Sequence, residues 1–290
     1  FDPSTESSGA NADSDGITYY NGFFWIVDYI DDEVYKYYTN GTYASFSFDT
    51  AGAGSDTPEG IVVYNDLFYI TDDTDDEVYK FNSDGTSNSS SFDIGTSGNA
   101  NGYGITHYND FFYITDTVDE LVYIYDSNGV YTNTNFSTGG TIGNTFPRGI
   151  TYYNDYFWIV DYSKNEVFQY YSNGSYAQFS FDTDKIGSAD PRGITTYNDY
   201  LYVVDTINDE VYQYGYNLKF QVHSCDDSNC DTETFVGPDN TSNTYFINSS
   251  IEILNTTLTP NNPYFQYKAY LSTDNSSFTP YLQSINIYYT

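Results

Sequence analysis

A phrase that begins with Gly-Ile occurs five times in the chain at an almost constant interval. Two of its copies read "GITYYNGFFWIVDYIDDEVYKY" and "GITYYNDYFWIVDYSKNEVFQY". Successive copies are 44, 44, 45 and 44 residues apart, and they begin at Gly16, Gly60, Gly104, Gly149 and Gly193. A fixed period of this length is typical of a solenoid, an array or a propeller.

The pattern inside each repeat predicts a propeller. A "GIxxY" run, an Asn-Asp or Asn-Gly turn, an "FWIVD"-type run, an "EVYKY"-type run and an "SFSFD"-type run follow one another. Four short apolar and aromatic strands separated by turn residues make one antiparallel blade. We therefore expect an all-β protein: a five-bladed β-propeller of four-stranded blades over residues 1–215, followed by a small β-sandwich domain over residues 216–290.

The repeats resemble the NHL family of propeller repeats over about residues 16–214. The resemblance rests on "PEGI" and two copies of "PRGI", on the "Y/W-I/V-x-D" strand ending, and on a Val six residues later. It implies the propeller fold and little about activity, because propellers carry many functions. NHL repeats often have a basic residue before that Val. This chain instead has Glu33, Glu77, Leu121, Glu166 and Glu210, which weakens any expectation of polyanion binding.

One aspartate recurs at the end of the second strand of every repeat. These residues are Asp28, Asp72, Asp116, Asp161 and Asp205. They are open to two interpretations, as a ring of metal-binding carboxylates or as acceptors for backbone N–H groups in their own turns. We favour the second, because a residue that is identical in all blades usually serves the blade.

The variable positions of "GIxxY" are expected to line the central channel. They are Thr18-Tyr19, Val62-Val63, Thr106-His107, Thr151-Tyr152 and Thr195-Thr196, with no carboxylate and one histidine. Some NHL-like propellers are metal-dependent lyases that use several histidines, but this chain has only His107 and His223. We therefore predict no catalytic residues, no cofactor and no enzymatic activity, with Ca²⁺ only weakly suggested by the acidic side chains.

The chain opens with "FDPSTESSGANADSDGI", which looks like the end of a repeat. The fifth repeat lacks an "SFSFD" run, so Phe1 and Asp2, within a closing strand over residues 1–5, are expected to supply it. Closure within one chain is favoured by local concentration. Donation of this strand to a neighbouring copy would instead produce a polymer. The segment "LKFQVHS" is a third candidate for the missing strand.

The last 75 residues leave the repeat and read as six further strands. They resemble β-sandwich modules of archaeal and bacterial surface or secreted proteins, a likeness that carries no catalytic motif. Cys225 and Cys230 are expected to form a disulfide, which indicates an oxidising, extracellular setting. A reduced pair is the alternative.

The charge excludes some partners. The chain has 41 acidic and 8 basic residues, a net charge of −33, which would repel nucleic acid and anionic lipid. No apolar run is long enough to span a membrane. The sequence starts with Phe1 and shows no signal-peptide pattern, which we expect of a mature form whose leader has been removed and equally of a truncated chain. Possible N-glycosylation sequons occur at Asn40, Asn88, Asn135, Asn173, Asn240, Asn248, Asn255 and Asn275.

These observations favour a non-enzymatic extracellular structural glycoprotein. We expect a subunit of a surface filament, sheath or layer, whose partners are copies of itself held through propeller and sandwich contacts. The abundance of Tyr suits protein–protein interfaces. The alternative is a carbohydrate-binding or adhesive surface protein, in which Tyr and Asn side chains stack on sugars and hydrogen-bond to them.

Overall fold

The computed structural model describes residues 1–7, 11–140, 142–215, 217–231, 234–237, 240–246 and 262–272. The chain divides into two compact units, Phe1–Tyr214 and Gly215–Thr290. Across the described ranges, no helix has the length and apolar character needed to cross a lipid bilayer.

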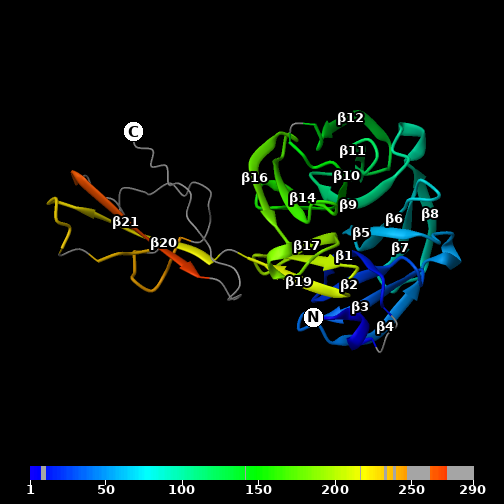
Figure 1. Ribbon diagram of the computed structural model, residues 1–290, viewed down its shortest axis with the longest axis horizontal. Helices are drawn as coiled ribbons and strands as arrows, with labels where there is room; N and C mark the ends of the chain where they lie inside the picture. Colours follow the sequence, from blue (N-terminus) through cyan, green and yellow to red (C-terminus); the bar gives the residue numbers. More distant parts are fainter. Residues whose placement is uncertain are drawn as a thin grey trace. The chain divides into compact units, whose positions relative to one another are not determined.

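The first unit is a five-bladed β-propeller, as the repeat predicted (Figure 1). In each of the first four blades, strands that follow one another in sequence pair antiparallel. Their strands are β1 (Ser14–Tyr20), β2 (Phe23–Asp28), β3 (Glu33–Tyr38) and β4 (Tyr43–Asp49); β5 (Pro58–Tyr64), β6 (Leu67–Asp72), β7 (Glu77–Asn82) and β8 (Ser87–Asp93); β9 (Gly102–Tyr108), β10 (Phe111–Asp116), β11 (Leu121–Asp126) and β12 (Tyr131–Ser137); β13 (Pro147–Tyr153), β14 (Tyr156–Asp161), β15 (Glu166–Tyr171) and β16 (Tyr176–Asp182).

The fifth blade has three strands, β17 (Pro191–Tyr197), β18 (Tyr200–Asp205) and β19 (Glu210–Tyr214). The first strand of every blade contacts the first strand of the next, and β17 contacts β1, so the ring is closed. Short helices precede β1 or join consecutive blades. They are α1 (Pro3–Glu6), η1 (Ala51–Ala53), η2 (Gly95–Ser97) and η3 (Asp184–Ile186).

The Asn-Asp pairs form the hairpin turns between the first and second strands. Asn65 and Asp66 both have positive φ, 50° and 61°, and the equivalent pairs in the next three blades behave alike. Two consecutive residues with positive φ suit the right-handed twist of the flanking strands, and Asn and Asp tolerate this conformation best after Gly. The predicted turn residues thus set the register of each hairpin.

The invariant glycine of each repeat lies where neighbouring inner strands approach most closely. A Cβ atom on Gly104 would overlap the carbonyl oxygen of Arg148 in the next blade, and one on Gly16 would overlap that of Glu59. The other three glycines meet their neighbours in the same way. Glycine is therefore required here by the packing of five strands around one axis.

The second unit contains one described sheet, in which β20 (Asn217–Cys225) pairs antiparallel with β21 (Tyr264–Ser272). Isolated bridges join Phe220 to Phe246 and Val222 to Val236. The sequence predicted a six-stranded sandwich, and its strands over residues 250–254 and 280–290 lie outside the described residues. β20 pairs with β21, so "LKFQVHS" is not the fourth strand of the last blade.

Candidate functional site

A cluster of four charged side chains and one tyrosine lies on the propeller axis, formed by the residue that precedes each invariant glycine. Its members are Asp15, Glu59, Tyr103, Arg148 and Arg192, which we call the axial cluster. The strand register shifts at this point, for example between Pro58 and Ile61. Such a bulge re-aims a side chain. The chain's two arginines both belong to this cluster.

The axial cluster joins blades that are not neighbours. The Arg148 guanidinium lies 3.2 Å from the Glu59 carboxylate and 3.7 Å from that of Asp15. Arg192 lies 3.3 Å from the Asp15 carboxylate, and it holds Asp190 through two nitrogens at 3.1 and 3.0 Å. Because Arg148 and Glu59 come from the fourth and second blades, their contact spans the axis.

Burial shifts the pKa values of the two carboxyl groups in the axial cluster. It raises the pKa of Glu59 well above its usual range, and the nearby Asp15 carboxylate adds to the shift. Burial also raises the pKa of Asp15, against the opposing effect of Arg148 and Arg192. Burial therefore favours the neutral form of Glu59, whereas the Arg148 guanidinium beside it favours the charged form.

The axial cluster corrects the sequence-based description of the channel. We expected inner strands without carboxylates, but Asp15 and Glu59 lie on β1 and β5 and meet at the axis. The alternation of a regular strand hid them, because the bulge at each glycine reverses the direction of the preceding side chain. A variable residue before each invariant Gly-Ile was the signal that could have revealed them.

The positions predicted to line the channel lie beyond the glycines. Thr18, Thr106, Thr151 and Thr195 are buried. Farther along the inner strands, aromatic rings of neighbouring blades stack, with centroids 3.8 Å apart for Tyr64 and His107. Burial lowers the pKa of His107, so its ring is neutral at pH 7. Its Nε2 atom has no hydrogen-bond partner among the described residues.

The repeated aspartates accept backbone hydrogen bonds in the structure. One Asp28 oxygen accepts from the amides of Ile30 and Asp31 at 3.0 and 2.9 Å, and the other accepts from Ala12 and Asp13 at 3.0 and 3.1 Å. Equivalent bonds occur in the other blades, at Asp72, Asp116, Asp161 and Asp205. These side chains hold the turn between the second and third strands.

Two groups of side chains have the spacing of metal ligands. Carboxylate oxygens of Asp56, Asp72 and Asp75 lie within 4.8 Å of one another. Asp72 already accepts from Thr57 and from the amides of Thr74 and Asp75, so calcium binding stays a prediction. In the second group, with His223, the sulfur atoms are joined in the Cys225–Cys230 disulfide, whose Cα atoms are 5.3 Å apart.

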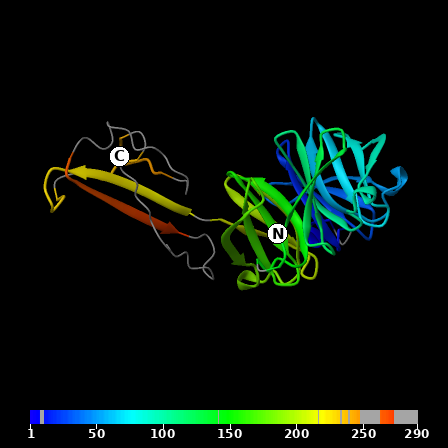
Figure 2. The ribbon, with the colours of Figure 1, turned by 90° about the horizontal axis from the view of Figure 1, so that it is seen from above.

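Phe1 closes the propeller of its own chain, beside the last blade (Figure 1 and Figure 2). Its nitrogen donates to the Val211 carbonyl at 3.1 Å, and the Val211 amide donates back to the Phe1 carbonyl at 2.7 Å. Its ring packs on Gly41 as Phe48 packs on Gly85. The closing strand expected over residues 1–5 is shorter, because Asp2 caps α1, accepting from the Thr5 amide at 2.8 Å.

The outer edge of β19 beyond Val211, at Tyr212–Tyr214, is left uncovered by a fourth strand within the described chain; we call it the blade-five edge. Tyr214 is only half-buried, whereas its equivalents in the other blades are fully buried. These are Tyr37, Phe81, Tyr125 and Tyr170. Gln213 is exposed. The fifth blade therefore presents backbone groups that the fourth strand covers in the other four.

Four sequons lie on exposed positions of the propeller. Asn40 and Asn173 are in turns before a fourth strand, and Asn88 and Asn135 are on β8 and β12. Asn240 is exposed in the second unit. The sequons at Asn248, Asn255 and Asn275 lie outside the described residues.

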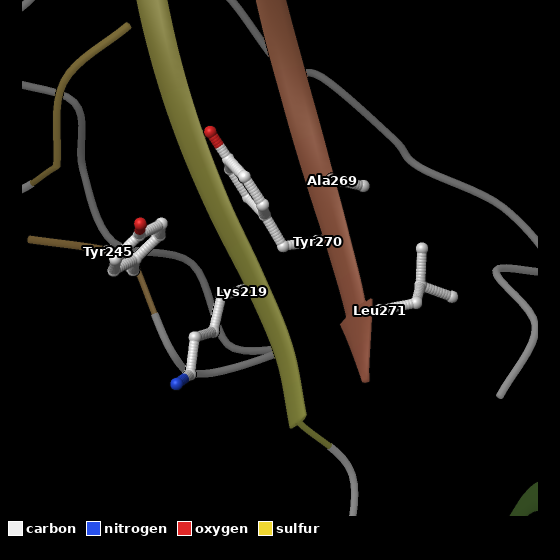
Figure 3. Close-up of a pocket in the computed structure, with 5 residues that line it drawn as sticks. All are labelled: Lys219, Tyr245, Ala269, Tyr270 and Leu271. Atoms are coloured by element: carbon white, nitrogen blue, oxygen red, sulfur yellow. The ribbon is translucent and has the colours of Figure 1, made fainter. Parts of the chain in front are cut away.

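The second unit carries a hollow of about 600 Å³ beside β20 and β21 (Figure 3). Lys219, Tyr245 and Tyr270 line one part of it, and the rings of the two tyrosines meet edge to face at 5.1 Å. Tyr270 donates to the Gln221 side chain at 2.8 Å, which fixes its ring. This arrangement offers an aromatic surface with one cation beside it.

The fold and the axial cluster define a five-bladed propeller with charged groups on its axis. No family model matches the chain, and no curated protein matches its sequence. Among solved structures, glutaminyl cyclase of Myxococcus xanthus is similar with a TM-score of 0.57 and 11% identity, over 70% of this chain and 90% of that one.

Two further structures are similar at a lower level. A nidogen/laminin complex gives a TM-score of 0.48 and 16% identity, over 71% of this chain and 81% of that one. The calcium-binding protein regucalcin of Agrobacterium tumefaciens gives a TM-score of 0.46 and 10% identity, over 70% of this chain and 90% of that one. At these identities the likeness is one of fold, and the NHL resemblance in particular stays a prediction.

The expectation that the chain is not an enzyme is wrong. Glutaminyl cyclase shares the fold, so this kind of propeller accommodates catalysis. The inner strands were also expected to be free of carboxylates, whereas Asp15 and Glu59 lie on β1 and β5. The likeness assigns no particular reaction to this chain.

Proposed function

We propose that the protein is a subunit of an extracellular filament, sheath or layer, in which a β-strand of one copy adds to the blade-five edge of the next. The observation that carries the proposal is the exposure of this edge in a propeller whose other blades are complete. Strand addition satisfies the free backbone groups of an edge and gives a directional, repeatable contact.

The geometry of the blade-five edge suits an incoming strand. Val211 exchanges both of its backbone hydrogen bonds with Phe1. In an antiparallel ladder the next outward-facing N–H and C=O groups are two residues on, at Gln213. The β19–β18 pairing is regular from Glu210 to Tyr214, so Gln213 lies in an undistorted strand.

The other four outer edges are poor templates for pairing. Each fourth strand contains a bulge with one residue at positive φ, between 55° and 58°. These residues are Ser45, Ser89, Asn133 and Gln178. Bulges twist an edge away from an approaching strand and are a common protection against edge-to-edge association. The contrast supports one assembly site per subunit.

An extracellular location is part of the proposal. Disulfides persist in oxidising compartments and are rare where thiol reductants are abundant, and Cys225 and Cys230 are bonded. Tyr38 and Tyr171 are 49% and 46% exposed at the propeller rim. Such amphipathic side chains are enriched at protein–protein interfaces.

A proline at position 213 tests the assembly. Gln213→Pro removes an N–H group that faces away from β18, so the blade keeps its own hydrogen bonds. The matched control is Gln213→Ala, which changes the side chain alone. We expect the proline variant to remain monomeric in sedimentation and electron microscopy, and the alanine variant to assemble as the unchanged chain does.

Both variants are first checked for folding by thermal unfolding. If the folded proline variant assembles normally, the blade-five edge is not the contact. If the unchanged chain stays monomeric at all salt and calcium concentrations, the proposal as a whole is wrong.

The hollow beside β21 favours a second candidate, binding of a carbohydrate to the second unit. Tyr245 and Tyr270 offer ring surfaces for sugar stacking, and Lys219 adds a hydrogen-bond donor and a positive charge. Titration with neutral and uronic-acid oligosaccharides, with Tyr245→Ala and Lys219→Ala as variants, tests it. Saturable binding that Tyr245→Ala weakens at least tenfold is expected, and binding unaffected by both variants would rule out the hollow.

A further inference from the structure

Four of the five propeller blades carry one sequon each. Asn40, Asn88, Asn135 and Asn173 belong to the first, second, third and fourth blades, and the fifth blade has none. All four are on the outermost hairpin of their blade, either in the turn before the fourth strand or on that strand. All four are exposed.

The distribution is not a copy of the repeat. The turn sequons of the first and fourth blades, "NGT" and "NGS", correspond to "DGT" and "NGV" in the second and third blades, which are not acceptors. Those two blades have sequons on the following strand instead, at Asn88 and Asn135. Each of these four outer edges therefore carries one acceptor asparagine, placed in the turn in two blades and on the fourth strand in the other two.

Local hydrogen bonds orient the carboxamide groups, and the side-chain nitrogens of Asn88 and Asn135 donate to Asn82 and Tyr131 at 3.2 Å. The Asn173 side-chain oxygen accepts from the Ser175 amide at 3.0 Å and from its hydroxyl at 2.7 Å. The Ser90 hydroxyl donates in the same way to Asn88 at 2.9 Å. In both cases the sequon hydroxyl polarises the carboxamide whose nitrogen is modified.

We infer that Asn40, Asn88, Asn135 and Asn173 carry N-linked glycans that cover the outer edges of four blades and leave only the blade-five edge bare. The donor is a polyprenyl-diphosphate-linked oligosaccharide. The asparagine nitrogen forms a bond to sugar C1, the bond from C1 to the phosphate oxygen breaks, polyprenyl diphosphate leaves with the electron pair, and a base takes one amide proton.

The consequence for assembly rests on the proposed function. A fourth strand is an edge strand, and a hydrated oligosaccharide beside it blocks the approach of a second sheet. The bulges and the glycans then act together on four blades. The fifth blade has neither, so it directs self-association to one side of the propeller.

Site occupancy is the first test. The full chain is secreted from an N-glycosylating cell, and its glycans are released with peptide N-glycosidase in heavy-oxygen water, which marks each modified asparagine as labelled aspartate. Mass spectrometry of the peptides is expected to find the label at all four positions, with equal occupancy in assembled and free protein. Unmodified positions on the outer edges would overturn the inference, whether or not the chain assembles.

A glycan placed on the bare edge is the second test. Gln213→Asn combined with Gly215→Thr creates a sequon on β19, and Gln213→Asn combined with Gly215→Ala does not. We expect the double variant with Gly215→Thr to lower the assembled fraction at least tenfold. The double variant with Gly215→Ala should leave that fraction unchanged. Equal assembly by a variant shown to be glycosylated at position 213 would contradict the role of the bare edge. If the unchanged chain does not assemble, the proposed function fails, and the occupancy measurement still decides the glycan assignment.

Discussion

At the scale of single residues, the centre of the propeller is packed too closely to accept an additional methyl group on the inner strands. Five glycines allow the inner strands to approach, and the residues before them meet across the axis in the axial cluster. Each buried arginine faces carboxylates at 3.0–3.7 Å. Removing one partner of such a pair leaves an uncompensated buried charge. A substitution of one charged residue in the axial cluster should therefore destabilise the fold.

A methyl group at the axis should destabilise the propeller. In Gly104→Ala, the added Cβ overlaps the Arg148 carbonyl oxygen, and overpacking of this kind costs about 2–3 kcal/mol. The control is Gly52→Ala, where the nearest atom is 3.7 Å away. Urea unfolding should show a large loss for Gly104→Ala alone, and equal effects would argue against close packing at the axis.

The raised pKa of Glu59 predicts a pH effect on stability. The unfolded chain releases this proton above about pH 4.5, while the buried acid keeps it, so the contribution of Glu59 to folding falls as pH rises from there. Glu59→Gln keeps a neutral group that still donates towards Asp15. The variant's free energy of unfolding, relative to the unchanged chain, should therefore rise as the pH is raised above about 4.5. A difference that is constant with pH would show that Glu59 is ionised in the folded protein.

At the scale of elements, the outer strand of each blade determines where a strand of another chain can pair with the propeller. Four blades end in a bulged fourth strand, and the fifth ends in β19 with Phe1 beside Val211. Phe1 takes the place that Phe48, Phe92 and Phe136 take in their blades, packing on a glycine with positive φ. Phe1 alone thus stands in for the fourth strand of the last blade, and most of the β19 edge stays open.

The closing residue should contribute more stability than its neighbour. Phe1→Ala removes a ring packed against Phe24 and Tyr37, with centroids 6.0 and 5.8 Å away, which should cost about 3 kcal/mol. Asp2→Ala removes only the cap of a four-residue helix, at about 1 kcal/mol. Thermal unfolding of the two variants should rank them in this order. The reverse order would mean that Phe1 does not close the ring.

At the scale of the whole molecule, charge controls association. A net charge of −33 makes copies repel one another at low salt. The screening length falls from about 30 Å at 0.01 M salt to about 3 Å at 1 M. Assembly through the blade-five edge therefore has to overcome a repulsion that salt removes.

Raising the NaCl concentration should accordingly promote assembly. At a fixed protein concentration, we expect the sedimenting fraction to increase from 0.01 to 1 M NaCl, roughly in step with the shortening of the screening length. Gln213→Pro serves as the control, and it should stay monomeric throughout. Association that weakens as salt rises would indicate contacts between opposite charges in place of strand pairing.

The repeat made the propeller predictable, but not its axis or its edges. Gly-Ile and Asn-Asp recur because every blade needs the same close approach and the same turn, so a period of 44 residues was sufficient to predict five blades. Asp15 and Glu59 were missed because a bulge breaks the alternation on which the prediction relied. The short closure by Phe1 was missed because Asp2 and Pro3 start a helix there.

Hydrogen exchange at the Gln213 amide shows whether the blade-five edge receives a strand from another copy. In the monomer this N–H faces outward from β19, and it should exchange quickly. In the assembled protein we predict protection comparable to that of amides inside the blades. Fast exchange at Gln213 in a protein that has assembled would mean that no strand is added at this edge.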